Sequence, residues 1–247
     1  MSQRAEKIKV RWPKVSVAVA FVGVVALTGC GLGDRSADGE EGAGAAVVAS
    51  QAPEEETAPE VAAAGESICG LPGSDQTEIE EAPADVQWEF VGTVQAPSVP
   101  EAGPGQIADN GFRKCYAHSP IGALVAASNV LAMGTDPNLV QELNEELVAE
   151  GPGREAVLED LEQNGVPRDD SGIRLSIAGY RLLGYGPDHA RIDLAVKGSD
   201  GMIASVTTDL RWEAGDWKVE LRPDGQHVIP AARLADTVGY NPWLAEG

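Results

Sequence analysis

The stretch Cys115-Tyr-Ala-His-Ser-Pro-Ile-Gly-Ala-Leu-Val-Ala-Ala-Ser-Asn-Val-Leu-Ala-Met133 decides how the fold is organised. Ser119 followed by Pro120 is typical of a helix start, because the hydroxyl caps a free backbone amide and proline fits the first helical position. Apolar side chains then recur at helical spacing, with alanines filling the turns between them. The stretch therefore predicts an alanine-rich helix that ends near Gly134 and lets another surface pack closely.

Two further helices are expected after this one. The first starts at Asp136-Pro137 and ends by Gly151, and the second runs from Arg154 to Asn164. Their many acidic residues are interpreted as solvated faces rather than as metal ligands.

After Gly172 the hydrophobic pattern changes from the period of a helix to the period of a strand. Four alternating segments, near residues 173–185, 189–197, 202–212 and 217–221, are separated by short turns. Short turns join antiparallel neighbours, so the pattern predicts a four-stranded antiparallel meander. Helices followed by such a sheet define an α+β fold class, and we expect the curved sheet to wrap the first helix as a cone.

The N-terminus has the pattern of an export signal. Residues 1–14 are rich in basic side chains, and Val15 to Leu27 is apolar and uncharged. Leu27-Thr-Gly-Cys30 resembles the bacterial lipobox, which predicts a lipoprotein with lipid attached to Cys30. An uncleaved transmembrane anchor is the alternative, because uncharged residues continue to Gly33. Both alternatives place the rest of the chain on the exocytoplasmic face of the cell membrane.

Composition suggests four regions. Residues 1–29 are a signal peptide or membrane anchor, and residues 30–66, without aromatic side chains, are predicted to be a disordered acidic tether. Residues 67–114 contain many prolines and are expected to form an irregular wrap with Trp88 and Phe90 buried. Residues 115–247 are the α+β cone domain with a C-terminal tail.

Once Cys30 carries lipid, Cys69 and Cys115 are the two thiols left in an exported chain. A disulfide between them is the default in that compartment. A cysteine-based metal or catalytic site is the alternative, but no histidine or second cysteine lies at ligand spacing from either one. No metal and no cofactor are predicted.

The net charge of −21 disfavours nucleic acid as a partner, because phosphate backbones are also negative. A general acidic bias of the source proteome explains the charge equally well and needs no specific partner.

The sequence offers little for catalysis. His118 and Ser119 could form a nucleophile pair, but the hydroxyl of a helix cap is already engaged and no strand-to-helix elbow surrounds it. Asp193 and Asp209 lie opposite the apolar faces of their strands and are interpreted as solvent-facing charge. We therefore predict no catalytic residues and an interior filled by the chain's own side chains. The residues expected to fill it are Leu124, Val125, Leu194, Val196, Leu210, Trp212 and Trp217.

Two parts of the chain resemble known families. Residues 115–222 are similar to the cystatin-like, nuclear-transport-factor-type cone of SnoaL-like proteins and of periplasmic domains of conjugal-transfer proteins. The motifs that carry this are the helix entry Ser119-Pro-Ile-Gly-Ala-Leu124 and the hairpin Trp212-Glu-Ala-Gly-Asp-Trp-Lys-Val-Glu-Leu221. The order of Cys69-Gly-Leu-Pro-Gly, Trp88, a proline-rich run and Gly111-Phe-Arg-Lys-Cys115 resembles uncharacterised exported proteins of actinobacterial integrative conjugative elements.

The resemblance implies a membrane-tethered scaffold or assembly component of a conjugative, type IV secretion-like apparatus, with other proteins of that apparatus as partners. A small-molecule-binding or SnoaL-like enzymatic cone is the alternative. An open cavity with converging polar residues would favour the alternative, whereas a filled apolar interior would favour the scaffold. The scaffold's first candidate contact surface is the tail that carries Tyr240, Pro242 and Trp243.

Overall fold

The structure, a computed structural model, describes residues 65–167 and 171–244. All of them belong to the second of two compact units in the chain, which spans residues 56–247. The predicted signal peptide or anchor, nearly all of the predicted tether and Cys30 lie outside the described residues. Within the described ranges, the helices are either too short or too polar to cross a membrane.

The predicted first helix is α1, Pro120–Met133, and it is buried on almost every side. The Ser119 side-chain oxygen accepts a hydrogen bond from the backbone N–H of Gly122 at 3.0 Å, which confirms the predicted cap. Inside the helix, the Ser128 hydroxyl donates to the Leu124 carbonyl at 2.8 Å, so this buried polar group is satisfied. A helix that is apolar all round needs neighbours on all sides.

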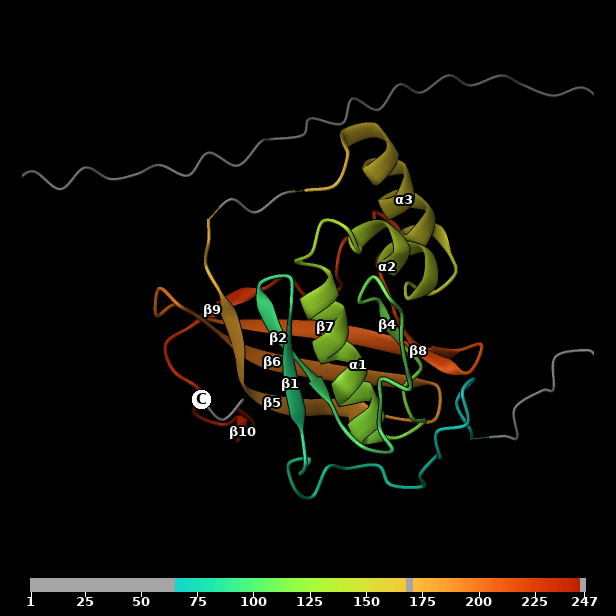
Figure 1. Cartoon of the computed structure of the whole chain (residues 1–247), viewed down its shortest axis with the longest axis vertical. Coiled ribbons are helices and arrows are strands. Elements are labelled where there is room, and N and C mark those ends of the chain that lie inside the picture. Colours follow the sequence, from blue (N-terminus) through green and yellow to red (C-terminus); the bar gives the residue numbers. More distant parts are fainter. Residues whose placement is uncertain (1–64, 168–170, 245–247) are drawn as a thin grey trace, which may run out of the picture. The chain divides into compact units, whose positions relative to one another are not determined.

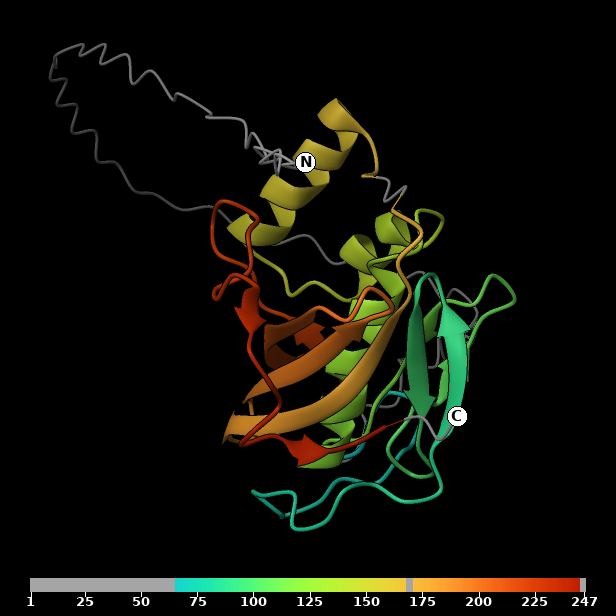
Figure 2. The ribbon, with the colours of Figure 1, turned by 90° about the vertical axis from the view of Figure 1, so that its left-hand side faces the viewer.

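A curled sheet of eight strands, shaped as a half-barrel, supplies those neighbours. In Figures 1 and 2, α1 lies between a hairpin of two strands and the larger part of the sheet. The main path of the sheet is β1 (Gln87–Val91), β2 (Val94–Ser98), β5 (Leu175–Tyr185), β6 (His189–Gly198), β7 (Ile203–Glu213) and β8 (Asp216–Val219). Two short strands complete it, because β10 (Asn241–Pro242) pairs with β5 and β9 (Ala232–Leu234) pairs with β7.

The predicted fold class, an α+β cystatin-like cone of helices followed by a curved four-stranded antiparallel sheet, is wrong. The four predicted strands do form, as β5 to β8, and they pair antiparallel. However, β1 and β2 belong to the same sheet and precede α1 in the chain. In addition, β2 pairs with β5 in parallel through Val94 and Leu175. The sheet is therefore mixed and dominates a described fold that has only three helices.

The missing strands come from residues 67–114, which we predicted to be an irregular wrap. Pro97 lies within β2, opposite Trp88 of β1. Since β2 pairs with β5 at Val94 alone, the proline removes no donor from a continuous ladder on that side. The Pro97 carbonyl instead accepts a hydrogen bond from Asn129 Nδ2 of α1 at 2.9 Å. Trp88 is half-buried, whereas the prediction that Phe90 is buried is wrong, because Phe90 is 47% exposed.

The other elements lie outside this sheet. A second, two-stranded sheet pairs β3 (Gln106–Ile107) with β4 (Arg113–Lys114). The two further predicted helices are present as α2 (Val140–Glu146) and α3 (Pro152–Asn164). The former begins later than predicted because the Asp136 carboxylate accepts the N–H of Asn138 at 2.9 Å and forms a turn.

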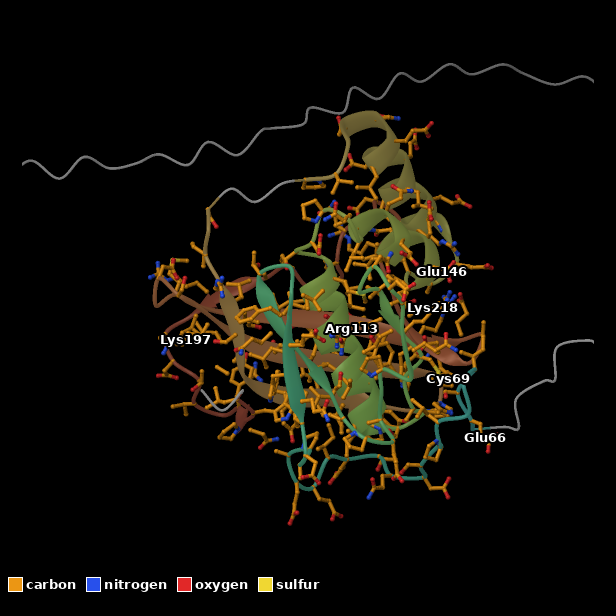
Figure 3. The ribbon with its side chains drawn as sticks, in the orientation of Figure 1. Glu66, Cys69, Arg113, Glu146, Lys197 and Lys218 are labelled. Atoms are coloured by element: carbon orange, nitrogen blue, oxygen red, sulfur yellow. A yellow bond between two sulfur atoms is a disulfide. The ribbon has the colours of Figure 1, made fainter. Side chains whose placement is uncertain are left out.

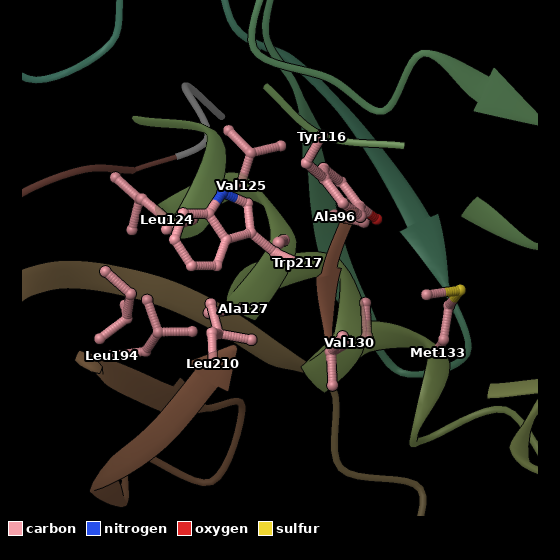
Figure 4. Close-up of a cluster of buried hydrophobic side chains, with 14 of the residues drawn as sticks. Ala96, Tyr116, Leu124, Val125, Ala127, Val130, Met133, Leu194, Leu210 and Trp217 are labelled. Carbon is pink, nitrogen blue, oxygen red and sulfur yellow. The ribbon is translucent and has the colours of Figure 1, made fainter. Parts of the chain in front are cut away.

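The hydrophobic core fills the space between α1 and the concave face of the sheet (Figure 4). Trp217 of β8 is fully buried there, and its Nε1–H donates to the Ala117 carbonyl at 2.9 Å. Leu124 and Val125 of α1 and Leu194 of β6 lie close to this indole in the close-up. Of the residues predicted to fill the interior, only Trp212 stays partly exposed.

Candidate functional site

An apolar cavity of about 300 Å³ lies at the C-terminal end of α1, between the helices and the concave face of the sheet. Its lining includes Val130 of α1, Leu143 of α2, Val157 of α3 and Val206 of β7. The short branched side chains among these residues leave space between the layers. The volume is at the lower end of the range for small-molecule sites. The prediction that the chain's own side chains fill the interior is therefore wrong at this end.

A few polar side chains face the cavity, and most are already bonded. Asn144 Nδ2 donates to the Val140 carbonyl at 2.8 Å, and the Thr135 hydroxyl donates to the Ala132 carbonyl at 2.7 Å. Partial burial of the imidazole lowers the pKa of His227, and the nearby Asp209 carboxylate opposes this shift. The lowered pKa of His227 favours its neutral imidazole, which carries one N–H donor and one acceptor nitrogen for a bound molecule.

Asp193 of β6 is buried on the face of the sheet that points away from α1. It accepts hydrogen bonds from Ser205 Oγ at 2.6 Å, Tyr240 OH at 2.7 Å and Arg181 Nε at 3.1 Å. Desolvation raises the pKa of Asp193, but the hydrogen bonds from these three side chains together outweigh it, so the pKa is lowered. The arrangement is an ionised carboxylate that fixes the C-terminal tail to the sheet.

Asp216 of β8 holds the backbone that leads into α1. Its two oxygens accept the N–H groups of Cys115 at 2.7 Å, Tyr116 at 2.9 Å and Trp217 at 2.8 Å. Cys115 has a φ of 67°, a left-handed conformation that turns two successive N–H groups toward one anion. Burial raises the pKa of Asp216 to about 6, although the backbone hydrogen bonds oppose the shift. The role of the Asp216 carboxylate is therefore structural, because its partners are backbone N–H groups.

The histidines named in the sequence analysis are not part of an acid–base pair. His118 stacks on Trp212, with ring centroids 4.1 Å apart, and its Nε2 forms a short hydrogen bond with the carbonyl of Pro187. His189 is exposed at the start of β6. Across the described residues, the hydrogen bonds connect neither ring to an Asp or Glu. The pairing of His118 or His189 with a buried Asp or Glu, which would have favoured an enzyme, is therefore not seen in the described residues.

The predicted disulfide between Cys69 and Cys115 is confirmed, with Cα atoms 6.2 Å apart. Figure 3 labels Cys69 beside the edge of the sheet. The backbone N–H of Ile68 donates to the Gly215 carbonyl at 2.8 Å, so the same segment is also bound to the turn between β7 and β8. Cys30, the predicted lipid attachment site, lies outside the described residues, and its lipidation stays a prediction.

The predicted contact residues of the tail lie in two different environments. The Trp243 ring packs between Trp88 of β1, at 5.0 Å, and Tyr180 of β5, at 5.9 Å between centroids. Tyr240 is also buried, whereas Pro242 is exposed in β10. Two of the three side chains are thus occupied within the chain itself. That the tail contacts a partner stays a prediction, with Pro242 as its accessible residue.

Sequence reasoning missed the burial of three charged groups, Asp193, Asp216 and Arg113. The interpretation of Asp193 as solvent-facing is wrong, because the tail covers it. Arg113 of β4 is also buried, and its guanidinium bonds Ser98 Oγ at 3.2 Å and pairs with Glu89 of β1 (Figure 3). Tyr240 in the tail was the one signal that could have predicted the burial of Asp193. A tyrosine hydroxyl that becomes buried needs a hydrogen-bond partner, and Asp193 is that partner.

The described part of the chain holds no group of three or more His, Cys, Asp or Glu arranged to bind a metal ion. That the protein needs neither a metal nor a cofactor stays a prediction.

The fold and these clusters define a disulfide-bonded domain in which a mixed sheet curls around one helix, with a small apolar cavity between the sheet and the helices. Residues 48–242 match the family described as "Domain of unknown function (DUF8175)", and the chain belongs to that family. No curated protein and no solved structure matches the chain.

Proposed function

We propose that the protein is a membrane-tethered scaffold or assembly component on the exocytoplasmic face, acting in a conjugative, type IV secretion-like apparatus. The observation that carries this proposal is that the buried charged side chains form their hydrogen bonds and ion pairs within the chain itself. Asp193 holds the C-terminal tail against the sheet, Asp216 holds the backbone that leads into α1, and Arg113 joins β4 to β1. Such a rigid body suits a component that presents fixed surfaces to partners. The lipobox-like Leu27-Thr-Gly-Cys30 supports the tether.

The test is conjugative transfer from a strain in which the gene is deleted. We expect transfer frequency to fall while growth is unchanged, and the parent chain to restore it. The variant Cys30→Ala should restore it poorly if the lipid tether is needed. Glu159→Gln, on the exposed face of α3, is the matched control and should behave as the parent. Unchanged transfer in the deletion strain would refute the proposal.

A photo-crosslinking residue at Pro242 tests the tail directly. We expect an adduct with another component of the apparatus, and no adduct from the same residue placed at Glu159. Equal yields from the two exposed positions would show that the tail has no special role.

Small-molecule binding is the second candidate function, and the apolar cavity of about 300 Å³ favours it. A molecule that fits there would be small, largely apolar and uncharged, with one polar group near His227. The fluorescence of N-phenyl-1-naphthylamine, a neutral apolar dye, measures such binding. Val206→Phe fills part of the cavity and should abolish the signal, whereas Val238→Phe, at a site that is 84% exposed, should not. Equal dye binding by both variants would refute this second candidate.

A further inference from the structure

We propose that a recess on the outer face of the sheet binds an acidic peptide segment of a partner protein. The recess has a volume of about 560 Å³ and is open to solvent. It is lined by Phe90 of β1, Gln95 of β2, Arg174, Lys197 of β6 and the turn that follows Lys197. This inference rests on the proposed function, because it names the chemistry of the partner that a scaffold of this kind would hold.

The first argument is the state of the two cations. In residues 65–167 and 171–244, every lysine and arginine except Arg174, Lys197 and Arg233 forms an ion pair with an Asp or Glu. Two of these three line the same recess, in a chain whose net charge is −21. At physiological salt, repulsion from acids more than about 8 Å away is largely screened. The recess is thus a local positive site on a negative protein.

The second argument is the geometry of Arg174. Its guanidinium lies over the ring of Phe90, 4.9 Å from the centroid. Stacking uses the flat face of the guanidinium and leaves the N–H donors at its edge free to bind a carboxylate with two hydrogen bonds. Its backbone N–H donates to Ser199 Oγ at 3.2 Å, and its carbonyl accepts the Ser199 N–H at 2.8 Å. The backbone that carries the guanidinium is therefore fixed by the turn after β6.

The third argument is the exposed aromatic ring. Phe90 is 47% exposed, and it pairs across the hairpin with Gln95, which lines the same recess. An apolar ring beside two unpaired cations matches a peptide in which acidic and aliphatic side chains alternate. Such a peptide satisfies both charges and covers the ring, whereas a free inorganic anion would leave the ring in water.

One acid, Asp200, lies next to the recess in sequence, between the lining residues Ser199 and Gly201, and it provides a further test. Asp200 lies in the turn after β6, where its Oδ1 accepts the N–H of Met202 at 3.0 Å. Asp200→Asn keeps that acceptor and removes a negative charge, so it should tighten the binding of an acidic peptide. Lys218 of β8, labelled far from Lys197 in Figure 3, pairs with Glu213 and takes no part.

The experiment uses full-length protein in detergent and a fluorescein-labelled octapeptide of alternating glutamate and leucine. Fluorescence anisotropy should show binding that weakens with salt, and the peptide with glutamine in place of glutamate should bind at least tenfold more weakly. Arg174→Ala and Lys197→Ala should each weaken binding about fivefold. Arg233→Ala removes the same charge outside the recess and should change nothing. Thermal melts check that these variants stay folded.

The contribution of Phe90 is tested with a second peptide of alternating glutamate and alanine. Phe90→Ala should weaken binding of the leucine peptide and leave the alanine peptide unaffected. The assignment is overturned if Arg233→Ala weakens binding as much as Arg174→Ala, if the glutamine peptide binds equally well, or if both peptides bind alike and inorganic phosphate displaces them. Peptide binding with unchanged transfer in the deletion strain would refute the role in conjugation and leave this recess standing.

Discussion

Replacing Asp193 by asparagine should loosen the C-terminal tail while leaving the rest of the domain folded. The carboxylate of Asp193 accepts from Ser205, Tyr240 and Arg181, and it is 1% exposed. Asparagine has nearly the same shape but carries one acceptor oxygen and one donor group. Its amide N–H₂ must therefore face at least one of the three existing donors.

The expected loss of unfolding free energy is about 2 kcal/mol at pH 7, since a hydrogen bond to a charged group contributes about 1.5–3 kcal/mol. A larger loss is not expected, because the Arg181 side chain is 40% exposed and water can solvate its freed charge. The lowered pKa of Asp193 sets the pH dependence. Its stabilisation is present above the unfolded-state pKa of about 4 and is lost as the pH falls through the lower folded-state pKa, so the difference between parent and variant should shrink in acid.

Guanidinium unfolding with the disulfide intact measures the global loss, and hydrogen exchange of residues 240–244 measures the tail. Tyr240→Phe removes one hydroxyl and should lose about 1 kcal/mol, and the double variant should lose less than the sum of the two single losses. Ser176→Ala, at a half-buried position of β5 outside this network, is the control. A change below about 0.5 kcal/mol for Asp193→Asn, together with unchanged exchange in the tail, would refute the reasoning.

Three further outcomes are expected. Because burial raises the pKa of Asp216 to about 6, the folded state takes up a proton there between about pH 4 and 6, and the contribution of this group to stability falls as the pH rises through that window. The parent should therefore lose about 2.5 kcal/mol relative to Asp216→Asn between pH 4 and pH 7, and a flat difference would contradict this. Replacing both Cys69 and Cys115 by serine should lower the unfolding free energy by about 4 kcal/mol, because the oxidised loop spans a sequence separation of 46. Equal stability of the parent with and without a reductant would argue against that estimate. Trp243→Ala should remove about 3 kcal/mol and speed hydrogen exchange in β1, since Trp88 loses its neighbour; unchanged exchange there would count against the contact.

The elements that the sequence predicts well are those whose signal is local. The Ser119-Pro120 cap and the alanine run define α1, and period-two alternation with short turns defines β5 to β8. The β1–β2 hairpin has no such signal, because Pro97 argues against a strand. It forms because Val94 reaches β5 and Asn129 binds the Pro97 carbonyl, and both contacts join residues far apart in the chain.

The same limit applies to the candidate site. The number of cysteines and the export signal are enough to predict the disulfide, because only two thiols remain once Cys30 is set aside. The burial of Asp193 depends on where the C-terminal tail packs. The alternation of apolar and polar residues along β6 does not predict the position of the tail. The cavity beside Val206 depends on the spacing of three packed layers, which composition does not specify.

The disulfide also determines how the domain would respond to a mechanical pull. Tension on the chain before Ser67 reaches Cys115, and with it the start of α1, through one covalent bond between the two sulfur atoms. The strands β1 to β4 lie off that line of force, inside a closed loop whose ends are 46 positions apart. That loop stores on the order of 150 Å of extended chain. An oxidising compartment keeps this length locked, whereas a reductant would release it and let a stretched attachment lengthen by the same amount.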